Sequence, residues 1–167
     1  MPKTVVRHEA EHLYADQPAT PAGRRLSDAI LRFRTAERVQ AERAVRASGL
    51  STVDLTALRY LVQGDRDGRD LSPKDLTVLL DSSSATVTNV IERLVQRSYV
   101  VRVRHPTDRR AHYLKPTAQA IALVDGSFAA HHAAIVHVID GLSAADQETA
   151  ARVIRDISDA LDELAQS

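Results

Sequence analysis

A cluster of hydroxyl, amide and basic side chains between residues 82 and 110 has the chemistry needed to contact DNA. Ser, Thr and Asn can hydrogen-bond with base edges in the major groove, and Arg can pair with phosphates or enter a narrow minor groove. The residues predicted to contact DNA are Ser82, Ser83, Ser84, Thr86, Thr88, Asn89, Arg93, Arg102, Arg104, Arg109 and Arg110. Asn89 is a candidate for base pairing because an Asn amide can bond bidentately with adenine.

Residues 83–97 are expected to form the helix that carries the polar part of this cluster. Apolar side chains recur there at intervals of three and four residues, which places on one helical stripe Val87, Val90, Ile91, Leu94 and Val95. At 100° per residue, Asn89 and Arg93 lie opposite that stripe, and the two threonines flank it. One of the serines at the start is expected to cap the helix. Such an amphipathic helix is common in soluble domains and does not by itself require DNA binding.

A β-hairpin is expected to follow this helix. Residues 99–104 and 111–115 alternate in period two around the turn-forming segment His105-Pro106-Thr107-Asp108. Arginines at and beside the tip suit a narrow minor groove of strong negative potential. The alternative is a solvated edge hairpin whose charges only prevent aggregation.

The chain has no net charge, yet its charges are segregated along the sequence. It contains 22 basic and 22 acidic side chains. Residues 82–115 carry seven Arg and Lys against two acids, whereas residues 116–167 carry two Arg against eight acids. This pattern fits a phosphate-facing surface joined to a region with another task. No spacing of Ser, His and Asp identifies a nucleophile and base, so we expect no enzymatic activity.

The segment 24–164 resembles the MarR (multiple antibiotic resistance regulator) family of dimeric winged-helix transcription factors. The most specific element is Asp108-Arg109-Arg110 followed by Leu114 and Thr117, which is similar to the wing signature of the family. Pro116 departs from the family pattern, but a proline suits a strand end that leads into a helix. The resemblance implies a mainly α fold with a small β-wing (α+β), in which a winged helix-turn-helix DNA-binding domain adjoins a helical dimerisation region.

Capping patterns and periodicity predict how the chain is divided. Ser51, Ser72 and Ser143 each precede an acid by three residues, a spacing that marks a helix start. The expected helices are 24–47, 51–63, 72–80, 83–97, 117–140 and 143–165, and Gly64 is expected to end the second in a left-handed conformation. The expected parts are a mobile N-terminal arm or short accessory helix (1–22), the first dimerisation helix (23–50), the winged helix-turn-helix domain (51–116) and the C-terminal dimerisation helices (117–167).

An apolar stripe near the C-terminus indicates a partner surface. It consists of Val153, Ile154, Ile157, Leu161 and Leu164. A small domain cannot fully cover this stripe by itself, although packing within one subunit is the alternative. The resemblance implies a homodimer whose two recognition helices lie roughly 34–36 Å apart on double-stranded DNA, and therefore a pseudo-palindromic operator. The expected function is a ligand-responsive repressor of transcription. The alternative is a winged-helix protein-interaction module whose basic wing docks an acidic partner.

Ligands are less well defined by the sequence. The resemblance implies a small aromatic or phenolic anion as effector, in a cleft for which the candidate lining residues are Phe33, Arg59, Tyr60 and His132. The histidines at positions 131, 132 and 137 are poorly placed for zinc, because they do not share one face of their helix. The acidic segment 65–70 lacks the spacing of a calcium loop. We therefore expect no metal and no cofactor.

Composition bounds the environment of the protein. The chain has no Cys, which excludes disulfides and thiol-based sensing. The apolar segment 118–139 is interrupted by polar residues and is not expected to span a membrane, and residues 1–14 lack the apolar core of a signal peptide. We therefore expect a cytoplasmic protein without a membrane partner.

Overall fold

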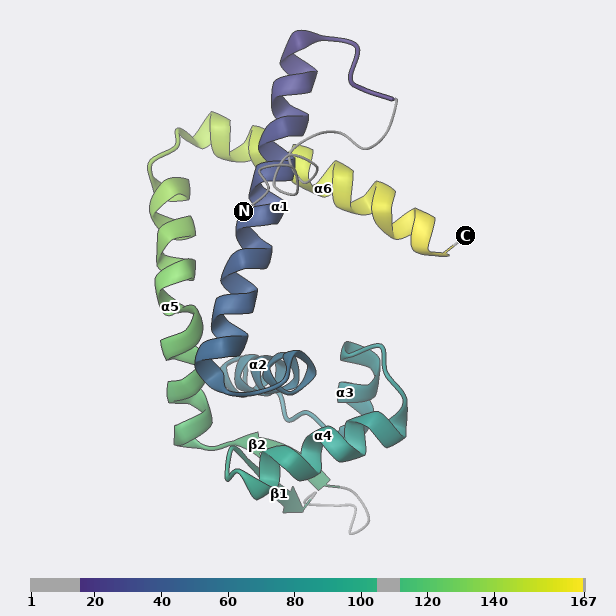
Figure 1. Cartoon of the computed structure of the whole chain (residues 1–167), viewed down its shortest axis with the longest axis vertical. Helices are drawn as coiled ribbons and strands as arrows, with labels where there is room; N and C mark the ends of the chain where they lie inside the picture. The colour runs from purple at the N-terminus through teal and green to yellow at the C-terminus, as the bar shows by residue number, and fades with distance from the viewer. Residues whose placement is uncertain (1–15, 105–111, 167) are drawn as a thin grey trace, which may run out of the picture. The chain divides into compact units, whose positions relative to one another are not determined.

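The computed structural model describes residues 16–104 and 112–166 as helices with one two-stranded antiparallel sheet (Figure 1). The elements are α1 (Pro21–Ser48), α2 (Thr52–Arg66), α3 (Pro73–Leu79), α4 (Ser84–Gln96), β1 (Val100–Arg104), β2 (His112–Pro116), α5 (Ala118–Asp140) and α6 (Ala144–Gln166). The mainly α fold with a small β-wing is thus confirmed. The chain divides into two compact units after residue 127, within α5. The functional division expected at residues 22, 50 and 116 stays a prediction.

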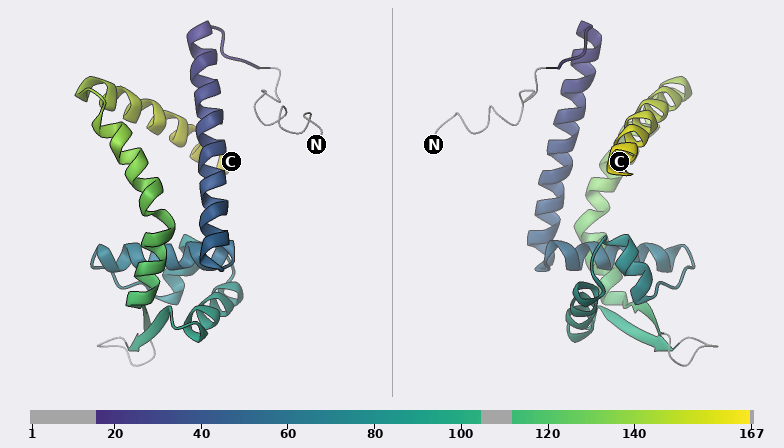
Figure 2. Two further views of the ribbon diagram at one scale, coloured as in Figure 1. Left: turned by 60° about the vertical axis from the view of Figure 1, so that its left-hand side comes forward. Right: turned by 90° about the vertical axis from the view of Figure 1, so that its right-hand side faces the viewer.

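The core of the first unit lies where α2, α3, α4 and the sheet meet, beside the C-terminal end of α1 (Figure 2). Its fully buried large side chains include Leu58, Leu61, Leu76, Val90, Leu94, Val100 and Leu114. Burying each stabilises the fold by about 1.5–3 kcal/mol relative to exposure. The stripe predicted on α4 is buried except for Val95, which is 37% exposed. That part of the prediction was wrong because Val95 lies about 90° from the centre of the stripe.

Serine hydroxyls begin the helices at the predicted places. In each case the side-chain oxygen accepts a hydrogen bond from the backbone amide three residues later, and the residues are Ser51, Ser72, Ser83 and Ser143. At Ser72 the bond is reciprocal, because the Asp75 carboxylate accepts from the Ser72 backbone amide at 2.7 Å. These contacts with Ser72 lower the pKa of Asp75. Local capping chemistry therefore explains the element boundaries well.

Gly64 does not end α2, so that prediction was wrong. The helix continues to Arg66, and the left-handed residue is Gly68, at φ 68°. Gly64 is buried inside the helix, where a Cβ would lie 2.9 Å from Leu71 Cγ and 3.1 Å from the Arg69 carbonyl oxygen. The glycine is required because the following loop packs directly against the helix backbone.

We expect Gly64→Ala to destabilise the protein by about 1–3 kcal/mol, the usual cost of overpacking. Intrinsic helix propensity alone would predict a gain in stability, because it favours Ala over Gly by about 1 kcal/mol. Gly126 provides the matched control, since it is also helical but a Cβ added there would meet nothing within 4 Å. Urea unfolding should show a lower midpoint for Gly64→Ala and an equal or higher one for Gly126→Ala. Equal effects at the two positions would contradict the packing argument.

The helix α5 is more apolar than its polar interruptions suggested. Within the described residues it is long and apolar enough to cross a membrane, with a mean hydropathy of 1.3, because its polar interruptions are mostly uncharged. Core helices of soluble proteins meet the same criteria. The start of α5 belongs to the core of the first unit, where Ala120 and Val124 are buried and Asp125 pairs with Arg66. We therefore assign this part of α5 to protein packing.

The second unit leaves the apolar stripe of α6 largely uncovered. Ile154, Leu161 and Leu164 are 64%, 61% and 72% exposed, and only Val153 on the stripe is half-buried. The stripe thus matches the surface expected to need a partner.

Candidate nucleic-acid interface

The helices α3 and α4 are joined by a tight turn and form a helix-turn-helix. Asp81 adopts φ 44° in this turn, a left-handed conformation that Asp tolerates better than most residues. The amide of Ser82 then donates to the Thr77 carbonyl at 3.2 Å. Ser83 begins α4 directly after the turn, so the predicted contact residues lie at the amino-terminal end of the second helix.

The amino-terminal half of α4 presents a polar surface. Ser83, Ser84, Thr86, Thr88 and Asn89 are exposed, and Ser82 is half-buried. The hydroxyl of Thr86 lies 2.9 Å from that of Ser83, and the Thr88 hydroxyl donates to the Ser84 carbonyl at 2.8 Å. These local bonds direct polar groups toward the helix, so the threonine methyl groups can face a thymine methyl. The carboxamide of Asn89 lies one turn further along the same exposed side.

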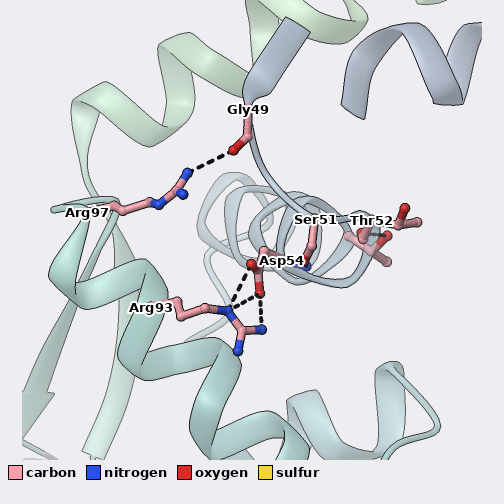
Figure 3. A network of polar contacts seen from close by, with 7 residues as sticks. Gly49, Ser51, Thr52, Asp54, Arg93 and Arg97 are labelled. Atoms are coloured by element: carbon pink, nitrogen blue, oxygen red, sulfur yellow. Dashed lines mark hydrogen bonds and ion pairs between the residues drawn. The ribbon is translucent and has the colours of Figure 1, made fainter. Parts of the chain in front are cut away.

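Arg93 differs from the free side chain that helical geometry predicts. Its Nε donates to both carboxylate oxygens of Asp54, at 3.2 and 3.1 Å, and its Nη2 donates to Oδ1 at 2.6 Å (Figure 3). These hydrogen bonds raise the pKa of the Arg93 guanidinium. Asp54 is only 5% exposed. We therefore withdraw Arg93 from the proposed base-contacting set, because its guanidinium is committed to a buried partner.

A second arginine, at the C-terminal end of α4, contacts the corner between α1 and α2. Arg97 Nη1 donates to the backbone carbonyl of Gly49 at 2.9 Å (Figure 3). Neither contact was predicted, because the partners are separated by 39 residues in one pair and 48 in the other. No local spacing encodes such a pairing. The one local signal of a buried ion pair was Asp54, an acid that lies between two apolar residues in the first turn of a helix.

The sheet forms the predicted wing. Its strands pair antiparallel, with Arg102 opposite Leu114 and Arg104 opposite His112. Both arginines are exposed. Arg109 and Arg110 lie outside the described residues, so their place at the tip stays a prediction.

The base of the wing is anchored to the end of α2. Lys115 Nζ lies 2.5 Å from an Asp70 oxygen and 3.1 Å from an Asp65 oxygen, and these bonds raise the pKa of its ammonium. Leu71 also forms an isolated β-bridge with Leu114. The acidic segment 65–70 therefore binds a lysine of the wing, a role that was not predicted from the sequence.

The residues expected to line an effector cleft can be compared with the cavity in the structure. A cavity of about 460 Å³ in the first unit is lined by Tyr60, Gln63, Gly64, Arg69, Leu71, Asp75, Val78 and Leu79. Of the four expected lining residues only Tyr60 borders it. Across residues 16–104 and 112–166, no cluster of three or more His, Asp or Glu side chains is suited to a metal ion.

Comparison with known proteins links this geometry to one family. Residues 48–111 match a sequence model of the MarR family. Over 108 residues the chain is 30% identical to the HTH-type transcriptional regulator MhqR of Bacillus subtilis (strain 168). That similarity covers 64% of this chain and 71% of MhqR.

Solved structures share the fold. The Q18P mutant of MepR from Staphylococcus aureus superposes with a TM-score of 0.63 at 18% identity, covering 81% of this chain and 96% of MepR. MepR in complex with DNA gives a TM-score of 0.58 at 19% identity, covering 80% and 98%. MepR bound to ethidium bromide gives 0.58 at 19% identity, covering 77% and 93%.

Proposed function

The chain belongs to the MarR family of DNA-binding transcriptional regulators, and on that premise we propose that it is a homodimeric repressor of a pseudo-palindromic operator. One observation carries the proposal: α4 buries Val87, Val90, Ile91 and Leu94 and exposes a hydroxyl and amide surface beside the arginines of β1. A helix held this way can enter the major groove while the wing lies against the neighbouring backbone.

We assign the contacts to two classes. The base-reading candidates are Thr86, Thr88 and Asn89, while Ser82, Ser83 and Ser84 lie near the helix start, where hydroxyls and amides suit a phosphate. Arg102, Arg104, Arg109 and Arg110 are proposed to contact phosphates or the minor groove. Base contacts determine sequence preference, whereas phosphate contacts strengthen binding to all DNA alike. We propose no catalytic role for this surface.

Dimerisation is proposed through the apolar stripe of α6. The stripe spans three turns and is exposed in the single chain. A second copy would cover it by two-fold symmetry and would place two recognition helices on one face of the duplex. This arrangement supports the expectation of a symmetric operator.

We further propose control by a small aromatic ligand. A ligand that binds better to a dimer with wrongly spaced recognition helices lowers DNA affinity by that difference in binding. MepR is known in complex with ethidium bromide, an observation that concerns MepR itself. An aromatic compound that saturates this protein without changing its DNA affinity would not be such an effector.

Selection from a random duplex pool tests the proposed function. We expect the purified protein to enrich a two-fold symmetric site and to bind it at least about 1,000-fold more tightly than a scrambled duplex, as specific DNA-binding proteins commonly do. The logarithm of the affinity should fall with the logarithm of salt concentration, with a slope near −0.9 per phosphate neutralised. Equal binding to both duplexes would contradict sequence reading and would favour a basic surface that docks another acidic partner.

A further inference from the structure

The C-terminal half of the recognition helix is attached to the corner between α1 and α2 by two arginines. Arg93 binds Asp54 in the first turn of α2, and Arg97 binds the carbonyl of Gly49, the residue that ends α1 (Figure 3). We call these four residues the corner clamp. Every member belongs to the first unit of the chain.

The Asp54 carboxylate is the fixed point of the corner clamp. Its side chain is 7% exposed, whereas that of Arg93 is 48% exposed. A buried carboxylate without a cation is strongly unfavourable, so Asp54 holds the guanidinium wherever the backbone of α2 places it. The fork of Arg93 uses two nitrogens on one carboxylate, which fixes orientation as well as distance.

Hydrophobic contacts alone would hold α4 less specifically. The buried residues of α4 are apolar, and burial of apolar surface is favourable without a preferred direction. Without the clamp, only the shape of the packed side chains would fix the rotation and position of the helix. Base reading tolerates movement of the helix poorly, because recognition side chains must be held within roughly 0.5 Å of their working positions.

We propose that Asp54 is a specificity-determining positioning residue for DNA reading: it acts through Arg93, and Arg97 fixes the same helix to the end of α1. This inference rests on the proposed DNA-binding function. Asp54 itself touches no DNA in this scheme. The helix α1 lies on the other side of the corner, so the clamp joins the helix expected to be the first of the dimerisation helices to the reading helix.

Charge and positioning predict opposite changes in DNA affinity when Asp54 is neutralised. Removing an acid near a DNA-binding surface should strengthen binding to any duplex, since the phosphates are negative. Positioning predicts the opposite for the preferred site, because Asp54→Asn keeps the shape of the side chain but weakens the ionic fork. We therefore expect Asp54→Asn to bind the selected duplex about 10-fold more weakly and the scrambled duplex equally or more tightly.

Glu92→Gln is the matched control. It removes one negative charge from α4, at the exposed position next to Arg93. By charge alone it should tighten binding to both duplexes to a similar degree and leave their ratio unchanged. A fall in the ratio for Asp54→Asn but not for Glu92→Gln separates positioning from electrostatics.

Arg93→Gln distinguishes positioning from direct contact. If Arg93 bound a phosphate, its loss would weaken both duplexes and reduce the salt slope by about 1. As a positioning residue it should lower the ratio, leave the salt slope nearly unchanged, and add little to the fall in the ratio for Asp54→Asn in the double variant. Additive losses on both duplexes with a smaller slope would overturn the proposal.

All variants are measured as full-length protein below their unfolding temperatures. If Asp54→Asn fails to fold, Arg97→Gln serves as the second variant, because its side chain bonds an exposed carbonyl and its loss should still reduce the ratio. An unchanged ratio for the folded variants overturns the inference. Failure of the wild-type protein to prefer any duplex would instead overturn the proposed function itself, so the two failures are distinguishable.

Discussion

Leu161→Asp is expected to convert the protein into a monomer that binds its selected duplex at least about 100-fold more weakly, since two linked half-site contacts gain 100- to 10,000-fold over one. Leu161 is 61% exposed and lies within the α6 stripe, with Ile154 and Ile157 before it and Leu164 after it. These four residues are spaced by three, four and three positions, as in the apolar seam of paired helices. A carboxylate there would have to be buried in the interface or exclude the partner.

Ala145→Asp is the matched control for this prediction. It adds the same charge to the same helix at an exposed position, about 160° away from Leu161. Sedimentation equilibrium should report a dimer for the control and a monomer for Leu161→Asp at the same concentration. A Leu161→Asp protein that remains dimeric would place the interface elsewhere. A monomer with undiminished DNA affinity would contradict the symmetric operator.

Asn89→Ala is expected to weaken binding to the selected duplex by roughly 10- to 100-fold, the range of one good bidentate base contact. Binding to a scrambled duplex should hardly change, because Asn carries no charge. Asn89 is exposed on α4 one turn after the helix start, in the part of a recognition helix that reaches base edges.

Two further substitutions serve as controls for Asn89→Ala. Gln96→Ala removes an exposed amide from the last residue of the same helix and should have little effect on either duplex. Arg102→Ala removes an exposed charge from the wing and should weaken both duplexes alike. Competition binding at two salt concentrations measures all three variants. Equal losses on both duplexes for Asn89→Ala would remove Asn89 from the base-reading set.

Features encoded by short sequence patterns could be predicted from this chain. Serine caps placed the helix starts within about two residues, as boundary signals usually allow. Apolar spacing identified the buried side of α4, and alternation identified both strands of the wing. In each case the interacting groups lie within a few residues of one another or repeat with a fixed period.

Features that depend on distant partners could not be predicted in the same way. Arg93 looks available on a helical projection, and only the fold brings Asp54 to it. Gly64 looks like a helix stop until Leu71 is found packed against it. Lys115 looks like a wing cation, yet the acids 45 and 50 residues earlier bind it. In each case the contact that defines the role of the residue lies outside any short sequence pattern.

The helix α2 carries an acid at each end, and each acid anchors a different part of the proposed DNA-binding surface. Asp54 holds the recognition helix, and Asp65 holds the base of the wing. They are eleven residues apart, which corresponds to about 16 Å along a helix. Inserting or deleting one residue between them would change their separation by about 1.5 Å and their relative direction by 100°. The length of α2 therefore sets the spacing between the proposed recognition helix and the base of the wing.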